Sequence, residues 1–205
     1  MKKTFFQKSY NLISSLLFVG LISFILSFAF NLLVKLFGDF DIPSLNSFII
    51  IIQNKLSLLG SYTSQIATIL VLVAVSLIIV ELTQRMISDS ILNYFKSVYQ
   101  TIRLRQFLRQ DDKSESAITI DNQTTITKFN PILKNFNQTV GKATVDVRKS
   151  TVVVFLKYPR TQQAQKLLRD MEAHIKEEIS SRNQNYYFSS PNREGNKLWF
   201  KATRR

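Results

Sequence analysis

The chain has 205 residues, with 27 Lys and Arg against 14 Asp and Glu, a formal charge of +13, one His and no Cys. The absence of Cys excludes disulfide scaffolds and thiolate metal sites. The mean hydropathy of +0.02 averages a very apolar first part with a very polar remainder. The length leaves room for one small domain beside the apolar part.

Two stretches without a formal charge, residues 9–34 and 56–80, predict membrane-spanning helices. Each exceeds the roughly 20 residues that a helix needs to cross ~30 Å of hydrocarbon. A cleaved signal peptide is the alternative for the first stretch, but that stretch is longer than a usual signal core and no small-residue cleavage pattern closes it. A buried core helix is the alternative for the second, but residues 69–75 are apolar on every face, which favours a span.

Basic residues precede the first predicted span and follow the second, and basic residues near span ends are retained on the cytoplasmic side. We therefore expect a bacterial cell-membrane protein, multi-pass, with cytoplasmic N- and C-termini and a two-span hairpin over residues 1–82. Within its short outer connection, residues 44–54 are apolar but too short to span. They predict an interfacial or re-entrant segment that begins at Pro43.

Residues 83–109 predict a basic amphipathic juxtamembrane helix. Its apolar residues recur at helical intervals: Ile87, Ile91, Phe95, Val98 and Ile102. Its basic residues are expected to contact anionic lipid headgroups: Lys96, Arg103, Arg105 and Arg109. The helix is interpreted first as a solvated connector held at the membrane and second as a self-association stalk. The polar composition of residues 110–122 predicts a linker.

Residues 123–205 predict a basic cytoplasmic α-β-β-α-β-β domain, so the chain is expected to be an α+β membrane protein. The expected elements, in order, are a helix capped by Asn130 and closed by Gly141, strands 143–147 and 151–156, a helix from Thr161 to about Arg182, and strands 186–188 and 197–201. We expect an antiparallel sheet with helices over one face. The first strand alternates as a half-buried strand does, and the break after it is short enough for a hairpin with the second. Residues 191–196 are rich in turn residues. The long helix is expected to bury a stripe of Ala164, Leu167, Leu168, Met171, Ile175 and Ile179.

The domain contains few residues suited to catalysis, so we expect a non-enzymatic protein without a cofactor or a metal. It lacks a glycine-rich phosphate loop, metal-ligand spacing and a Gly-x-Ser-x-Gly motif. One pattern, Arg169 with His174, is similar to the Arg-x4-His signature of HEPN-type ribonucleases. The two residues lie about 140° apart on a helix, and an exposed, non-catalytic His is the alternative interpretation.

Basic and aromatic residues of the domain suggest a nucleic-acid interface, because basic groups neutralise phosphates and aromatic rings stack on unpaired bases. The candidates are Lys142, Arg148, Lys149, Lys197, Trp199, Lys201, Arg204 and Arg205. Strand alternation places Trp199 opposite Leu198 and Phe200, which predicts that Trp199 is exposed. The alternative is that the aromatic rings fill the core and the charge only holds the domain in solution or near anionic lipid.

Two N-terminal spans, a basic juxtamembrane helix and a β-β-α-β unit over residues 143–202 resemble the non-motor front end of Gram-positive FtsK/SpoIIIE-type conjugative coupling proteins. The resemblance is one of architecture and rests on no diagnostic residue string. It implies an oligomeric membrane anchor for DNA transfer. The chain has no Walker A loop, so the resemblance implies an accessory to DNA or to a separate DNA-translocating ATPase or relaxase.

Three functional hypotheses follow. The first is a membrane-anchored adaptor that binds DNA or a DNA-processing partner in plasmid transfer or maintenance. The second is a membrane-perturbing effector of a phage-defence or toxin system, whose spans oligomerise on a signal sensed by the cytoplasmic domain. The third is the HEPN-like ribonuclease. The lipid bilayer and further copies of the chain are expected partners in the first two.

Overall fold

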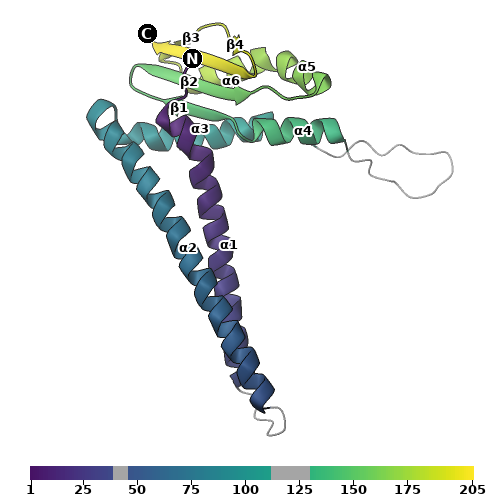
Figure 1. Cartoon of the computed structure of the whole chain (residues 1–205). Coiled ribbons are helices and arrows are strands. Elements are labelled where there is room, and N and C mark those ends of the chain that lie inside the picture. The colour runs from purple at the N-terminus through teal and green to yellow at the C-terminus, as the bar shows by residue number, and fades with distance from the viewer. Residues whose placement is uncertain (39–45, 112–129) are drawn as a thin grey trace, which may run out of the picture. The chain divides into compact units, whose positions relative to one another are not determined.

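The structure is a computed structural model that describes residues 1–38, 46–111 and 130–205 (Figure 1). The described chain forms two compact units. One unit, Ser9–Glu81, is called the helical unit here. The other joins Met1–Lys8 to Leu82–Arg205 and is called the sheet unit.

The helical unit is built from α1 (Phe5–Gly38) and α2 (Asn46–Ser88), whose ends extend into the sheet unit. Both helices are long and apolar enough to cross a membrane, with mean hydropathies of 2.4 and 2.7 in their most apolar windows. Only 11% and 17% of the residues in those windows are buried. This exposure differs from that of a core helix in a soluble protein, which is mostly buried.

Residues 46–54 do not form an element separate from the second apolar helix, and the predicted interfacial or re-entrant position of residues 44–54 stays a prediction. Asn46 begins α2, and the helix continues through residues 48–52 to Ser88. No proline interrupts residues 46–88, and β-branched isoleucine lowers helix propensity only slightly. Pro43 and Ser44 lie outside the described residues.

Small residues line the contact between α1 and α2. Gly20 and Ser27 on α1 are buried, as are Gly60, Ala67 and Ala74 on α2, and each set repeats every seven residues. Ser27 Oγ donates a hydrogen bond to the Gly60 carbonyl oxygen at 2.8 Å. Small residues let two helix backbones approach closely, and a seven-residue repeat is the period of a left-handed helix pair.

The sheet unit contains a five-stranded antiparallel sheet. Its strands are β1 (Thr144–Val147), β2 (Thr151–Lys157), β3 (Tyr186–Phe188), β4 (Asn192–Glu194) and β5 (Lys197–Arg204). The order is β1-β2-β5-β3, with β4 also paired to β5. The predicted β1–β2 hairpin is confirmed. Strand β4 was expected to be a turn, and the turn itself is confined to residues 195–196, where Gly195 has φ 58°.

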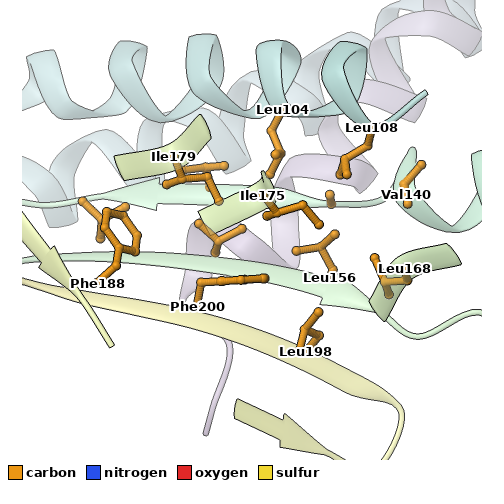
Figure 2. Packing of buried hydrophobic residues seen from close by; sticks show 14 of the residues in the cluster. Leu104, Leu108, Val140, Leu156, Leu168, Ile175, Ile179, Phe188, Leu198 and Phe200 are labelled. Atoms are coloured by element: carbon orange, nitrogen blue, oxygen red, sulfur yellow. The ribbon is translucent and has the colours of Figure 1, made fainter. Parts of the chain in front are cut away.

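Helices α3 (Ile91–Leu108), α4 (Pro131–Val140), α5 (Gln162–Asp170) and α6 (Glu172–Arg182) contribute to the core on one face of the sheet. Figure 2 shows leucines and isoleucines of α3, α5 and α6, and Val140 of α4, on the same side as Leu156, Leu198 and Phe200 of the sheet. The predicted Asn130 cap is confirmed, since its side chain accepts hydrogen bonds from the amides of Ile132 and Leu133.

The single helix predicted to run from Thr161 to Arg182 is wrong, because Met171 separates α5 from α6. The Tyr158 hydroxyl donates to Glu172 Oε1 at 2.9 Å, so the first residue of α6 is held to the segment that follows β2. The predicted buried stripe is nevertheless retained, with Ala164, Leu168, Ile175 and Ile179 all in the core.

The predicted juxtamembrane helix is divided between two elements. Ile87 falls in the last turn of α2, and α3 begins after Asp89 and Ser90. A solvated connector would expose its polar side chains to water. In α3 the polar residues Ser97, Gln100 and Thr101 are buried, whereas Phe95 is exposed.

The polar stripe of α3 covers the open edge of β1. The Val147 amide donates to Ser97 Oγ at 2.9 Å, the Val145 amide donates to Thr101 Oγ1 at 3.0 Å, and Arg105 Nε donates to the Ala143 carbonyl oxygen at 2.8 Å. Four residues of a helix rise about 6 Å and two residues of a strand about 6.7 Å. Every fourth residue of α3 therefore meets every second residue of the strand. The predicted half-buried alternation of β1 is wrong for this reason, and all four of its residues are buried.

Replacing Thr101 with Val should destabilise the sheet unit by about 1–3 kcal/mol, because the Val145 amide would lose its buried partner. Trp199 is the only Trp of the chain and is buried, so its fluorescence reports unfolding of this unit. Urea titration in mild detergent measures the change. The control, Thr203→Val on an exposed position of β5, should leave the midpoint nearly unchanged. Equal midpoints for the two variants would contradict the role of Thr101.

Candidate functional site

The sheet face opposite the helices carries a cluster of lysines. Lys157 on β2 pairs directly with Lys197 on β5. Lys201 lies four residues along β5 and therefore on the same face, because side chains alternate along a strand. All three side chains are exposed. Together with Lys3 from the N-terminal segment, they are called the lysine face.

The N-terminal segment Met1–Lys8 lies on this same side of the sheet. Gln7 Nε2 donates to the Val153 carbonyl oxygen at 3.1 Å. Lys3 Nζ lies 3.7 Å from the centroid of the Phe155 ring, and the Met1 amino group forms an ion pair with Glu194. The sequence analysis used the N-terminal lysines only to orient the spans and missed this docking.

Trp199 is not exposed, which corrects the expectation from strand alternation. Its side chain does lie on the face opposite Leu198 and Phe200, but only 1% of it is accessible. The Phe155 ring packs against it with ring centroids 4.9 Å apart, and Lys3 lies over Phe155. Alternation predicted the correct face and could not show that the ring of the paired Phe155 packs against Trp199 there. Trp199 is therefore excluded as a stacking platform.

Tyr187 is an exposed aromatic residue on this face. Its side chain is 66% accessible. It pairs with Thr203, two residues from Lys201 on the same face of β5, so Tyr187 and Lys201 are diagonal neighbours. The adjacent Tyr186 is less exposed, and its hydroxyl donates to the Arg148 carbonyl oxygen at 2.8 Å. Tyr187 thus offers the ring that sequence reasoning had sought at Trp199.

The lysine face carries four lysines beside the acidic residue Glu194, which pairs with Lys197 across β4 and β5. The pKa of Lys3 is lowered, first by partial burial and then by the positive charges of Lys197 and Lys157. Like charges placed directly opposite each other on paired strands repel. Glu194 is engaged by the Met1 amino group. An anion bound at this face would relieve the repulsion among the lysines.

The other predicted nucleic-acid residues lie elsewhere on the sheet unit. Arg148 and Lys149 occupy the β1–β2 turn, and the Arg204 amide donates to the Ser150 carbonyl oxygen beside that turn. Arg205 follows β5, while Lys142 lies before β1 at the opposite end of that strand. Arg148 also forms an ion pair with Asp146 at 3.1 Å. The predicted set is therefore divided among three places, and only Lys197 and Lys201 belong to the lysine face.

A buried Arg85 joins the end of α2 to β1. Its side chain is inaccessible; Nη2 lies 2.5 Å from Asp146 Oδ1 and Nη1 donates to the Val147 carbonyl oxygen at 3.1 Å. Asp89 lies 3.6 Å away on the next helical turn, and the Phe6 ring centroid lies 5.3 Å from the guanidinium carbon. The sequence analysis treated Arg85 as a charge flanking the membrane, because nothing local in the sequence indicates a buried partner sixty-one residues later.

Arg169 and His174 are separated by the break at Met171, with Arg169 in α5 and His174 in α6. A cavity of about 240 Å³ beside His174 is lined by Phe107, Glu177, Glu178 and Ser181, and Arg169 does not line it. Within the described residues no group of three His, Asp or Glu side chains is placed to hold a metal ion. These positions add no support to the ribonuclease hypothesis.

Replacing Asp146 with Leu should destabilise the sheet unit by about 3–5 kcal/mol, because Arg85 would stay buried without its closest counter-charge. Combining it with Arg85→Met and Asp89→Asn should restore part of the loss, since the buried charges of Arg85, Asp89 and Asp146 are then removed together. Urea titration followed by Trp199 fluorescence compares the variants. A triple variant no more stable than Asp146→Leu alone would show that the buried charges are not the source of the effect.

Comparisons with known protein families, with curated proteins and with solved structures find no match to this chain.

Proposed function

We propose that the protein is a non-catalytic adaptor, anchored in a bacterial cell membrane by α1 and α2, that binds DNA on the cytoplasmic side through the lysine face. The observation that carries the proposal is the cluster of Lys3, Lys157, Lys197 and Lys201 beside the exposed ring of Tyr187. Conjugative transfer or maintenance of a plasmid is the process in which such an adaptor would act, together with a separate ATPase or relaxase.

The sheet unit is built from two separate segments of the chain, which supports their lying on the same side of the membrane. Met1–Lys8 precedes α1, Leu82–Arg205 follows the helical unit, and the two parts pack into one compact body. If α1 and α2 each cross the bilayer once, the chain returns to the side from which it started, as this packing requires. Basic residues at both ends favour the cytoplasmic side.

The form of the lysine face suits a nucleic-acid strand. Lys197 and Lys201 are four strand residues apart, about 13 Å, which corresponds to roughly four nucleotides at the 3.4 Å spacing along one strand of B-DNA. The two lysines can therefore contact phosphates several nucleotides apart on one strand, and Tyr187 at the end of the path presents a ring on which an unpaired base can stack. We therefore expect single-stranded DNA to bind at least as well as duplex DNA.

A membrane-perturbing effector is the second candidate, and the buried Arg85–Asp146 pair favours it. That pair joins the end of α2 directly to the sheet, so a ligand-induced shift of β1 would act on α2. Induced expression followed by a dye-leakage assay separates the two candidates, because an adaptor leaves the membrane intact.

Neutralising Lys157, Lys197 and Lys201 to Gln should weaken DNA binding and lower its salt dependence. Each lost phosphate contact reduces the log–log salt slope by about 0.7 on single strands, so three contacts reduce it by about 2. Fluorescence anisotropy of a labelled oligonucleotide measures this on the full chain in nanodiscs of neutral phosphatidylcholine, which contribute no net lipid charge.

The matched control replaces Lys134, Lys166 and Lys176 with Gln. It removes the same charge from the helices α4, α5 and α6, which cover the other face of the sheet. This variant should retain most of the affinity. An equal loss in both triple variants would indicate non-specific attraction by net charge. A native chain that does not bind either form of DNA would refute the proposed function.

Replacing Tyr187 with Ala should weaken binding to single-stranded DNA by about 1–3 kcal/mol while sparing duplex DNA, because paired bases offer no free face for stacking. Tyr187→Phe keeps the ring and should bind as the native protein does. The same anisotropy assay compares the two variants on both forms of DNA. A loss in Tyr187→Phe as large as in Tyr187→Ala would assign the effect to the hydroxyl and contradict stacking.

A further inference from the structure

The outer face of α3 is an apolar stripe. Its members are exposed by 39% to 76% and comprise Ile91, Leu92, Phe95, Tyr99 and Ile102. At 100° per residue they fall within an arc of about 100°. The polar side chains of the same helix are directed toward β1, so the fold of the sheet unit fixes the apolar side outward. A contiguous exposed apolar surface of this kind marks an interaction site.

A basic cavity adjoins the stripe at the C-terminal half of α3. It has a volume of about 520 Å³ and lies between α3 and α4. Arg105, Arg109 and Lys134 line it, and none of the described lining residues is acidic. Ile102 belongs both to the stripe and to the cavity wall, so the apolar and basic surfaces are continuous.

We propose that α3 and this cavity form an interfacial binding site for an anionic phospholipid, with the acyl chains along the stripe and the phosphate in the cavity. The chemistry fits an interfacial helix, which buries aliphatic and aromatic side chains at the acyl boundary and directs Lys and Arg to the headgroups. The exposed Lys96 and Arg103 on α3 supply further positive charge at the same surface.

The position of α3 in the chain also favours a lipid surface. It begins after only Asp89 and Ser90 beyond α2, the second helix that is long and apolar enough to cross a membrane. The three steps from Ser88 to Ile91 span at most about 11 Å, so the first turn of α3 lies near the α2 terminus. The inference shares membrane anchoring with the proposed function and is independent of DNA binding.

A second copy of the chain fits the stripe less well. Residues 91–108 contain three basic and no acidic side chains, so a symmetric pair of α3 helices would bring like charges together. Interfaces favour complementary charge, and an anionic leaflet provides it.

Single-cysteine labelling tests the stripe, and the natural absence of Cys makes each introduced label unique. Spin labels at Phe95→Cys and Ile102→Cys are compared with Ala173→Cys on exposed α6 and with Ile69→Cys on α2, in nanodiscs of phosphatidylcholine with phosphatidylglycerol. We expect the ratio of oxygen to nickel-chelate accessibility to be severalfold higher at positions 95 and 102 than at 173.

The outcomes separate the possible occupants of the stripe. Water-like accessibility at positions 95 and 102, with lipid-like accessibility at 69, would overturn the lipid site while leaving the membrane anchor intact. Water-like values at 69 as well would overturn the anchor and the proposed function with it. Dipolar broadening at 95 that disappears on dilution with unlabelled protein would assign the stripe to a second copy.

Retention of lipid tests the cavity. Arg109→Gln with Lys134→Gln should lower the binding of phosphatidylglycerol to the full chain in detergent, measured by native mass spectrometry, by about fivefold for each charge removed. The control, Lys166→Gln with Lys176→Gln, should retain the lipid. Arg105 is left in place because it also bonds β1. Equal loss in the control would overturn the site. So would efficient competition by inorganic phosphate, which would show that the cavity recognises phosphate without the lipid.

Discussion

The unpaired outer edge of β1 is the constraint on which the sheet unit depends. A strand edge buried without partners costs free energy for every orphaned amide and carbonyl group. Here hydroxyl and guanidinium groups of α3, rather than another strand, provide the partners, at a spacing that fits both repeats. This arrangement requires a polar stripe on the buried side of α3 and therefore displaces the apolar residues to the outside. The direction of the apolar stripe is a consequence of satisfying β1.

The sheet unit thus has two surfaces of different chemistry, one rich in lysine and one apolar. The lysine face brings four lysines together beside the acidic residue Glu194, and the outer side of α3 presents apolar side chains beside a basic cavity. They are formed by different residues, so a polyanion at one and a lipid at the other need not compete. The buried Arg85 ties α2 to β1 and sets the start of α3 relative to the strand that α3 must cover.

Local patterns predicted most elements of the sheet unit, because Asn130, the β1–β2 hairpin and the stripe from Ala164 to Ile179 depend on neighbours in sequence. The failures have a common origin in distant contacts. Trp199 is covered by Phe155, which lies beneath Lys3, and β1 is covered by α3, whose periodicity revealed amphipathicity without revealing which side faces the protein. The candidate site was located only in part, since the sequence suggested Lys197 and Lys201 and omitted Lys3, Lys157 and Tyr187 as site residues.

The docking of Met1–Lys8 on β2, which in turn pairs with β5, has a consequence for biosynthesis. Residues 1–8 cannot complete their contacts with this part of the sheet until residues 197–204 have been synthesised, because β5 pairs with β2. Contacts so remote in sequence form slowly. Residues 9–81 are therefore synthesised before the sheet can close, and a chain that stalls before residue 197 lacks the strand that lies between β2 and β3.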